Sequence, residues 1–215
     1  EFQLLLSVIP RIFKAFERVY GTAGTVPVRQ IWCEILYFIG NIKEALHLSY
    51  EQYVLCKDDP MNKIMALCVL FRCYLALGHS KKAENSMIEM IKLSQKYPEC
   101  LESYQTIRTW TNLTTNWCGG MPRYYFDKDG NRHPTLEDRI AGIRSGIAKS
   151  PRFEQYFINY AKKSYPNAYP LRTYYLDIFD AMYFYQIDER EKKEKIFKKI
   201  YEISCATNLL MPIVE

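Results

Sequence analysis

Residues 31–60 read IWCEILYFIGNIKEALHLSYEQYVLCKDDP, and residues 69–98 read VLFRCYLALGHSKKAENSMIEMIKLSQKYP. The two stretches repeat each other at a spacing of 38 residues. The matched pairs are Gly40 and Gly78, Lys43 and Lys81, Ala45 and Ala83, and Pro60 and Pro98. A fixed period of about 20–50 residues is typical of stacked units that bury their apolar faces against one another. The sequence therefore predicts a repeat architecture.

Each stretch has the apolar spacing of two helices joined by a short turn, so we predict helical hairpins over 27–57 and 60–97. Gly40 and Gly78 stand where the first helix of each hairpin should end. Asn41 can cap the helix that follows the first of these glycines. Helices joined by turns of about two to five residues pack antiparallel, and a constant offset between two such pairs predicts stacked hairpins.

The rest of the chain is also expected to be mainly helical, so the fold class predicted is all-α. Residues 2–20 are apolar at helical spacing, with Pro10 expected to start or kink the second part. Further helices are expected over 99–117, from 135, and over 151–163, 171–186 and 188–210. The last two of these can form a third, diverged hairpin.

The segment 118–134 should leave the helical stack as a non-helical excursion or a short β-hairpin. Paired glycines, two prolines and an Asp-Gly turn prevent a continued helix, and the aromatic run before that turn suits a strand. Its aromatic and basic residues either pack back over the helices or form a docking segment for a partner. The residues of this possible docking segment are Arg123, Tyr124, Tyr125, Phe126 and Arg132.

We expect one continuous domain with three parts. Residues 1–117 form the helical repeat region, with its two clear repeats at 27–60 and 61–98. The excursion at 118–134 follows, and residues 135–215 supply helices that pack on the stack or continue it. Because the chain begins Glu-Phe-Gln without a methionine, it can be a piece of a longer protein.

Composition favours an intracellular protein, cytoplasmic or nuclear, without a cofactor. The seven cysteines are scattered and odd in number, which suits thiols in a reducing compartment. No Cys-x-x-Cys pair occurs and there are only three histidines, so no zinc site is expected. The longest apolar run, 64–77, is interrupted by Arg72 and is too short to cross a membrane.

Residues 27–98 resemble repeats of the tetratricopeptide type. The matching positions in the second copy are Leu67, Leu70, Phe71, Tyr74, Gly78, Ala83, Met87 and Pro98. In the first copy they are Trp32, Cys33, Leu36, Gly40, Ala45, Ser49 and Pro60. Two features depart from the family pattern: Phe71 and Cys33 replace a small glycine, and each unit is about one helical turn longer than usual.

The resemblance implies a TPR-like α-solenoid whose first helices line a concave groove for a partner protein or peptide. The groove residues carried over by position are Gln30, Glu34, Tyr37, Phe38, Cys68, Arg72 and Leu75. Arg72 interrupts an otherwise apolar helix, and an unpaired buried guanidinium is costly. It can therefore either bind a ligand or pair with Glu34 across the stack.

The sequence favours a binding module over an enzyme. It has no Gly-rich phosphate loop, no Gly-x-Ser-x-Gly and no His-Glu-x-x-His. Cys118 and His133 could serve as nucleophile and base, but a cysteine beside two glycines is more often part of a turn. The alternative function is RNA or single-stranded nucleic-acid binding through 123–133, although Asp127 and Asp129 would repel phosphate. We therefore predict a non-catalytic interaction scaffold within a larger complex.

Overall fold

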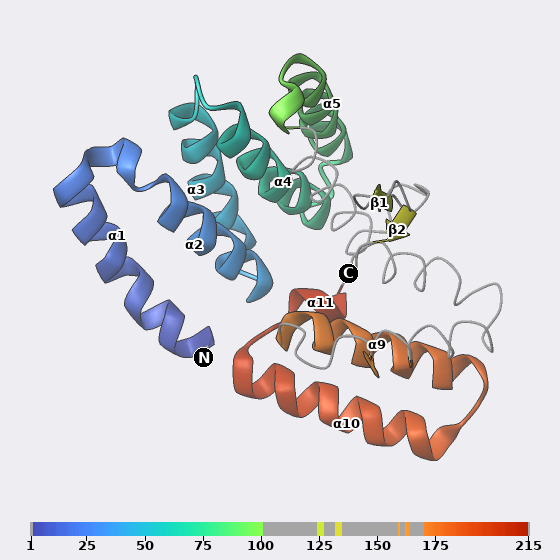
Figure 1. The fold of residues 1–215 in the computed structure, drawn as a ribbon. Coiled ribbons are helices and arrows are strands. Elements are labelled where there is room, and N and C mark those ends of the chain that lie inside the picture. Colours follow the sequence, from blue (N-terminus) through green and yellow to red (C-terminus); the bar gives the residue numbers. More distant parts are fainter. Residues whose placement is uncertain are drawn as a thin grey trace. The chain divides into compact units, whose positions relative to one another are not determined.

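The computed structural model of the chain is mainly helical, which confirms the predicted α-helical character (Figure 1). The residues that it describes are 2–100, 124–126, 132–134, 159, 162, 163 and 170–214. The contacts within the chain divide it into two compact units. Unit 1 comprises residues 1–107 and 207–215, and unit 2 comprises residues 108–206.

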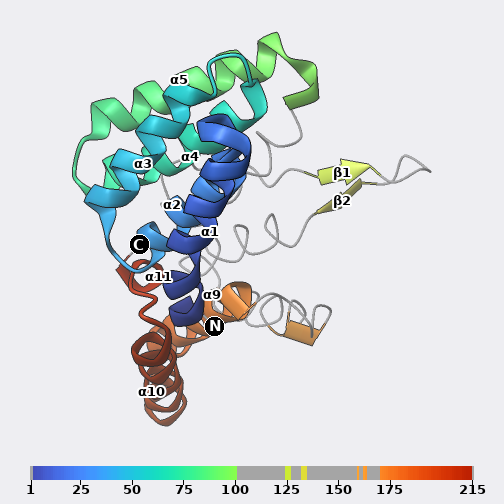
Figure 2. The ribbon, with the colours of Figure 1, turned by 90° about the vertical axis from the view of Figure 1, so that its left-hand side faces the viewer.

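Unit 1 is built from consecutive helices that pack each on the next, and α2 also contacts α4. Figure 1 shows α2 to α5 following one another across the unit, and Figure 2 shows them from the side with α1 lying over α2. The helices are α1 (Phe2–Gly24), α2 (Val26–Phe38), α3 (Ile42–Leu55), α4 (Pro60–Ala76), α5 (Ser80–Lys96), the 3-10 turn η1 (Pro98–Cys100) and α11 (Met211–Val214). Helices α2 to α5 occupy the two predicted hairpins.

The turns inside the two hairpins have the same geometry. Gly40 and Gly78 adopt positive φ angles of 84° and 74°. The Gly40 amide donates to the Tyr37 carbonyl at 2.9 Å, and the Gly78 amide donates to the Leu75 carbonyl at 2.9 Å. The amide of the following residue also donates to a carbonyl of the preceding helix, from Asn41 to Leu36 and from His79 to Tyr74. This pattern ends a helix on a left-handed residue, and glycine adopts that conformation at least cost.

The second helices of the two hairpins bury equivalent positions. Ala45 on α3 and Ala83 on α5 are both fully buried, as the recurrence of a small residue predicts. The burial continues at the same spacing of 38 residues along both helices. The further buried pairs are Ser49 and Met87, Gln52 and Met90, and Cys56 and Ser94. The first copy thus buries polar side chains where the second buries methionines.

Two residues stand where a side chain can cap a helix start: Asn41, and Asp59 directly before Pro60. Only the second of them does so. Asp59 caps α4, because its side chain accepts a hydrogen bond of 3.1 Å from the backbone amide of Asn62. Asn41 precedes α3 but makes no side-chain cap, and its amide group instead donates to Glu44. The cap predicted at Asn41 is therefore wrong.

Helix α1 does not break at its proline. Pro10 lies inside the helix, and the non-helical backbone is found at Gly21, which has a φ of 70°. The start or kink expected at Pro10 stays a prediction, because a bend at a proline is compatible with helical backbone angles. Glycine imposes no steric cost at positive φ, which explains why the change of direction falls on Gly21.

In unit 2 the described helices are α9 (Pro170–Gln186) and α10 (Arg190–Thr207). Asp188, at a positive φ of 56°, occupies the turn, and the Glu189 amide donates to the Phe184 carbonyl at 3.0 Å. The turn therefore has the same pattern as those at Gly40 and Gly78, and the two helices form the expected third hairpin. Helix α10 ends before the predicted boundary at residue 210, because Asn208 adopts a left-handed conformation with a φ of 58°.

The charged face of α10 differs in detail from the prediction. The sequence favours ion pairs of Glu191 with Lys195 and of Glu194 with Lys198. The structure instead pairs Arg190 with Glu194 at 2.9 Å, and Lys192 with Glu189 at 3.6 Å.

Two short strands lie within the predicted excursion. Strand β1 (Tyr124–Phe126) pairs antiparallel with β2 (Arg132–Pro134), and Tyr125 lies opposite His133. The remainder of 118–134, and the helices expected over 101–117 and 135–158, lie outside the described residues.

Candidate functional site

Most of the groove residues implied by the repeat resemblance are buried in unit 1. Glu34 and Leu75 are half-buried, and none of the seven is fully exposed. The buried ones are Gln30, Tyr37, Phe38, Cys68 and Arg72. These positions are therefore mostly packed inside unit 1, and their role as a partner site stays a prediction.

Arg72 is accommodated by aromatic rings of the neighbouring first helix. Its guanidinium carbon lies 4.2 Å from the ring centre of Tyr37 and 4.8 Å from that of Phe38. Cation–π contact of this kind is stronger when the cation is desolvated, as it is here. Glu34, the partner considered from the sequence, accepts a hydrogen bond of 2.6 Å from Gln30. The adjacent aromatic residues 37 and 38 were the signal in the sequence that could have indicated this environment.

A cavity of about 700 Å³ lies among α1, α2 and α3. Its lining is mixed, with aliphatic and aromatic side chains from all three helices and a few charged groups. The lining residues are Pro10, Phe13, Lys14, Glu17, Thr22, Arg29, Trp32, Leu48, Tyr50, Glu51, Val54 and Leu55. We call this feature the α1–α3 pocket, and its size falls in the range of pockets that hold small molecules or peptide side chains.

Helical spacing positions the aromatic wall of the α1–α3 pocket. Ile9 and Phe13, four residues apart on α1, face the same side of that helix and pack toward α2. The Phe13 and Trp32 rings meet edge to face, with centres 5.5 Å apart and planes at 67°. This wall is therefore held by the packing of α1 on α2.

A buried cation contributes to the same wall. Arg29 is only 4% exposed, and its guanidinium carbon lies 4.9 Å from the centre of the Phe13 ring. One of its terminal nitrogens donates to Glu51, which also lies 3.4 Å from His47. Its Nε is buried and has no hydrogen-bond partner among the described residues.

The α1–α3 pocket has balanced charges and an apolar rim, which suits a ligand that is largely uncharged. Lys14 and Arg29 are balanced by two acids of the lining, so the pocket has no strong charge of either sign. At the edge, the Val54 side chain is 56% exposed and Tyr50 is 55% exposed. Exposed apolar side chains around a concave site are typical of interaction surfaces.

The residues that the repeat resemblance marks for a groove lie on α2 and α4, so the sequence did not indicate the α1–α3 pocket. The repeat resemblance begins at residue 27, so it assigned no role to α1. Two signals were available: the spacing of Ile9 and Phe13 on α1, and the adjacent apolar pair Val54 and Leu55 late in α3.

The possible docking segment is described only as backbone. Tyr124, Tyr125, Phe126 and Arg132 belong to the two paired strands, and their side chains lie outside the described residues, as do Arg123 and Cys118. Its role, whether in docking a protein or in binding nucleic acid, stays a prediction.

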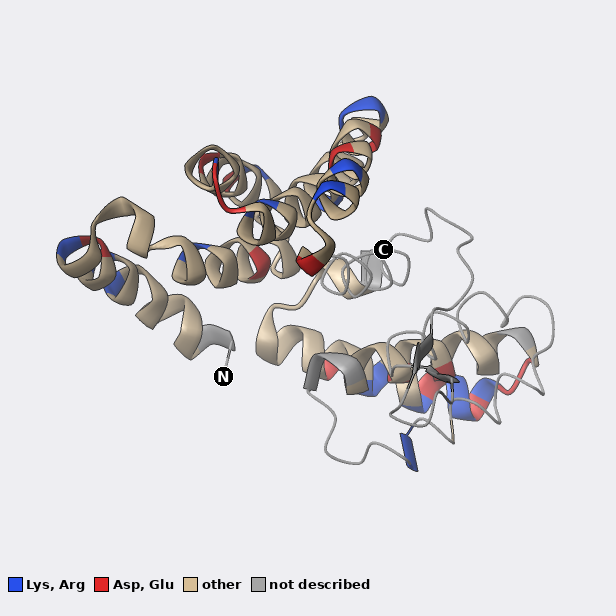
Figure 3. Ribbon diagram, turned by 45° about the horizontal axis from the view of Figure 1, so that its top comes forward, with Lys and Arg blue, Asp and Glu red and all other residues tan. Residues whose placement is uncertain are grey.

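The charges of unit 1 do not separate by sign along α5, where Figure 3 shows basic and acidic residues mixed.

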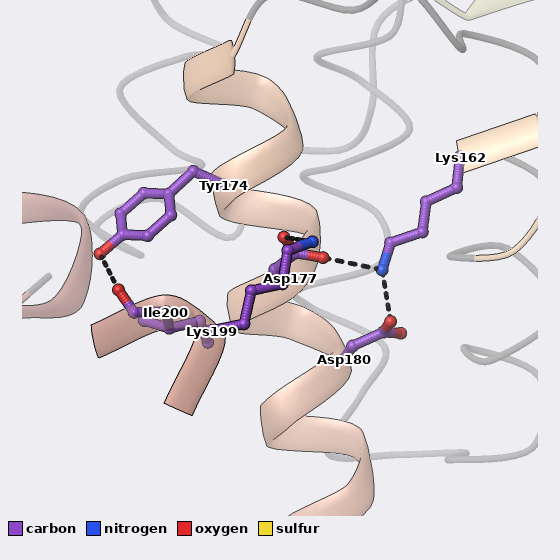
Figure 4. Close-up of polar contacts among 6 residues, drawn as sticks. All are labelled: Lys162, Tyr174, Asp177, Asp180, Lys199 and Ile200. Atoms are coloured by element: carbon purple, nitrogen blue, oxygen red, sulfur yellow. Dashed lines mark hydrogen bonds and ion pairs between the residues drawn. The ribbon is translucent and has the colours of Figure 1, made fainter. Parts of the chain in front are cut away.

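Unit 2 contains a compact network of charged side chains (Figure 4). Lys162 donates to Asp177 at 3.1 Å and also to Asp180, and Lys199 donates to Asp177 at 2.6 Å. Both aspartates are buried on α9, whereas Lys199 lies on α10. Alongside it, the Tyr174 hydroxyl donates to the Ile200 carbonyl at 3.5 Å.

The chemistry of this network is that of a structural tie between helices. Burial acts to lower the pKa of Lys162, but the hydrogen bonds and charges of Asp180 and Asp177 outweigh it and raise that pKa. A lysine that acts as a nucleophile or base needs the opposite shift. The charges of this network therefore suit a role in holding α9 and α10 together through ion pairs better than a role in catalysis.

Five of the described thiols, those of Cys33, Cys56, Cys68, Cys73 and Cys100, are buried, whereas that of Cys205 is exposed. Burial raises the pKa of Cys33 to about 11 and that of Cys73 to about 12. Thiols with such values stay protonated at neutral pH and react slowly. No group of three or more potential metal ligands is found within the described part of the chain. Within that part, no helix combines the length and apolar character that a membrane crossing would need.

Comparison with known proteins gives no relative for this chain. No family model matches it, and no curated protein and no solved structure matches it either.

Proposed function

We propose that this chain is a non-catalytic protein-interaction module of the TPR-like, α-solenoid kind, working inside a larger assembly. Three observations support the proposal: consecutive antiparallel hairpins, matched turns at Gly40 and Gly78, and contact between the first helices of adjacent hairpins. Cys33 and the other described cysteines are free thiols, which suits a reducing, intracellular compartment.

The observation that carries the proposal is the α1–α3 pocket. It offers about 700 Å³ bordered by Phe13, Trp32 and Leu48, with exposed apolar side chains at its rim. Its balanced charges offer little electrostatic attraction to a strongly charged ligand. The partner that fits is a short peptide segment that inserts one bulky apolar side chain between α1 and α3.

A library of random short peptides displayed against the full chain tests this proposal. Peptides that bind should share one bulky apolar residue, and their affinity should be measured with synthetic versions. Val54→Asp places a carboxylate at the rim of the pocket and should weaken binding at least about tenfold.

Ile88→Asp provides the matched control. Ile88 is an exposed apolar residue of α5, 41% exposed, and does not line the pocket. This variant should bind the selected peptides as the parent does. The proposal fails if no peptide is enriched, or if both variants bind equally well.

A further inference from the structure

The segment 208–214 returns to unit 1 after the whole of unit 2. Its residues 209–214 read LLMPIV, an uninterrupted apolar run. Leu209, Met211 and Pro212 are buried, whereas Asn208 and Leu210 are exposed. Residues 208–210 belong to no helix or strand and 211–214 form the short helix α11, so the segment is held by a few buried apolar side chains. Short segments that bind in a groove are anchored in the same way.

The segment forms a main-chain hydrogen bond with the end of α2. The Leu210 amide donates to the Phe38 carbonyl at 2.9 Å, and α11 contacts α2. Phe38 is the last residue of α2, where helix carbonyls lack partners within the helix. No backbone donor reaches the equivalent carbonyl, that of Ala76, among the described residues. Within the described part of the chain, the Phe38 carbonyl thus has a partner that the Ala76 carbonyl lacks.

The turn after α2 also leaves room for the segment. A Leu210 methyl carbon lies 3.4 Å from the position that a Cβ of Gly40 would take. The equivalent position at Gly78 has no atom within 4 Å. The end of α2 thus differs from its repeat counterpart in two ways, and both involve the same segment.

We propose that the end of α2 is a second peptide-binding site, which segment 208–214 occupies as a ligand in cis. Its ligand class is a short apolar segment with a free main-chain amide for the Phe38 carbonyl. A partner segment of this class binds only when 208–214 leaves. A tethered segment acts at an effective concentration of up to about millimolar, so even weak cis binding hides the site from a partner.

The test uses a fluorescent peptide with the sequence of residues 207–215, TNLLMPIVE, and the full chain. Met211→Asp should release the cis segment, because Met211 is buried. The labelled peptide should then bind the Met211→Asp chain at least about tenfold more tightly than the parent chain. A peptide methylated on the Leu210 nitrogen lacks the donor and should bind several-fold more weakly.

Tyr201→Asp is the control chain, since Tyr201 is an exposed residue of α10, and it should keep the site closed like the parent. If the Met211→Asp chain does not fold, the same titration uses the folded parent chain cut at a protease site inserted after Thr207. Three results would overturn the proposal. The labelled peptide could bind the parent chain as tightly as the Met211→Asp or cut chain, it could bind none of these chains, or the methylated peptide could bind as tightly as the unmethylated one. Val54→Asp should leave this binding unchanged, which separates the result from that for the α1–α3 pocket.

Discussion

Ala83 shows at the scale of one residue how tightly the hairpin is packed. It is fully buried among side chains that include Leu67 and Met87. We predict that Ala83→Leu overpacks this contact and lowers the free energy of unfolding by roughly 1–3 kcal/mol. Urea denaturation measures the change. Ala76→Leu, at an exposed position of α4, is the control and should change stability by less than about 0.5 kcal/mol. Equal stability of the Ala83→Leu chain and the parent would contradict the packing described here.

The buried thiols predict a fall in stability at alkaline pH. Cys33 and Cys73 have pKa values of about 11 and 12 in the folded chain, against 9.0 as the ordinary value. Above pH 9 the unfolded chain loses these protons while the folded chain keeps them. Raising the pH therefore favours unfolding, by up to about 1.4 kcal/mol per pH unit for each thiol.

Denaturation at pH 8 and pH 10 measures this effect. Replacing Cys73 by alanine should make the dependence on pH shallower, whatever it does to stability at pH 8. A Cys73→Ala chain with the same pH dependence as the parent would rule out this thiol as a cause.

At the scale of elements, the glycine turns are what the hairpins share. Gly78 has a φ of 74° and no atom near its would-be Cβ, so only backbone strain opposes a side chain there. We predict that Gly78→Ala lowers the free energy of unfolding by about 1–2 kcal/mol. Gly78→Asn should cost less, because asparagine tolerates this conformation better. Equal costs for the two variants, measured by thermal melts, would show that φ is not the determinant.

The charged network ties α9 to α10. Asp177→Ala removes the acceptor of both Lys162 and Lys199, and it should lower the free energy of unfolding by about 1–3 kcal/mol. The exposure of Lys199 keeps this cost toward the lower end, because solvent screens its charge. Glu194→Ala removes the exposed pair with Arg190 and should cost less than about 0.5 kcal/mol. If chemical denaturation gives similar losses of stability for Asp177→Ala and Glu194→Ala, the buried network contributes no more to stability than an exposed ion pair.

Local sequence signals predict the elements well and the site poorly. The turn at Gly40 and the cap at Asp59 depend on residues within one helical turn, so the sequence alone indicates them. Asn41 stands at the start of α3 but does not cap it, and its amide nitrogen donates to Glu44 instead. The α1–α3 pocket depends on the packing angle of three helices, and the contact of Leu210 with Phe38 joins residues far apart in the chain. No spacing rule predicts such non-local contacts.

At the scale of the whole molecule, two sites of different construction belong to unit 1. The α1–α3 pocket is an open cavity proposed to take a side chain, whereas the end of α2 accepts a main-chain hydrogen bond from a segment that follows unit 2 in the sequence. A partner that engages both would first displace 208–214. Interaction through two linked sites can exceed the affinity of either one alone.

The most direct test of the account is a methyl NMR titration of the full chain with a selected peptide. The methyl signals of Leu48, Val54 and Leu55, which line the α1–α3 pocket, should shift together and saturate as peptide is added. The methyl signals of Leu209 should stay in place, because that residue belongs to the other site. Shifts that cluster away from α1 and α3, or no shift at saturating peptide, would contradict the assignment of this pocket as the partner site.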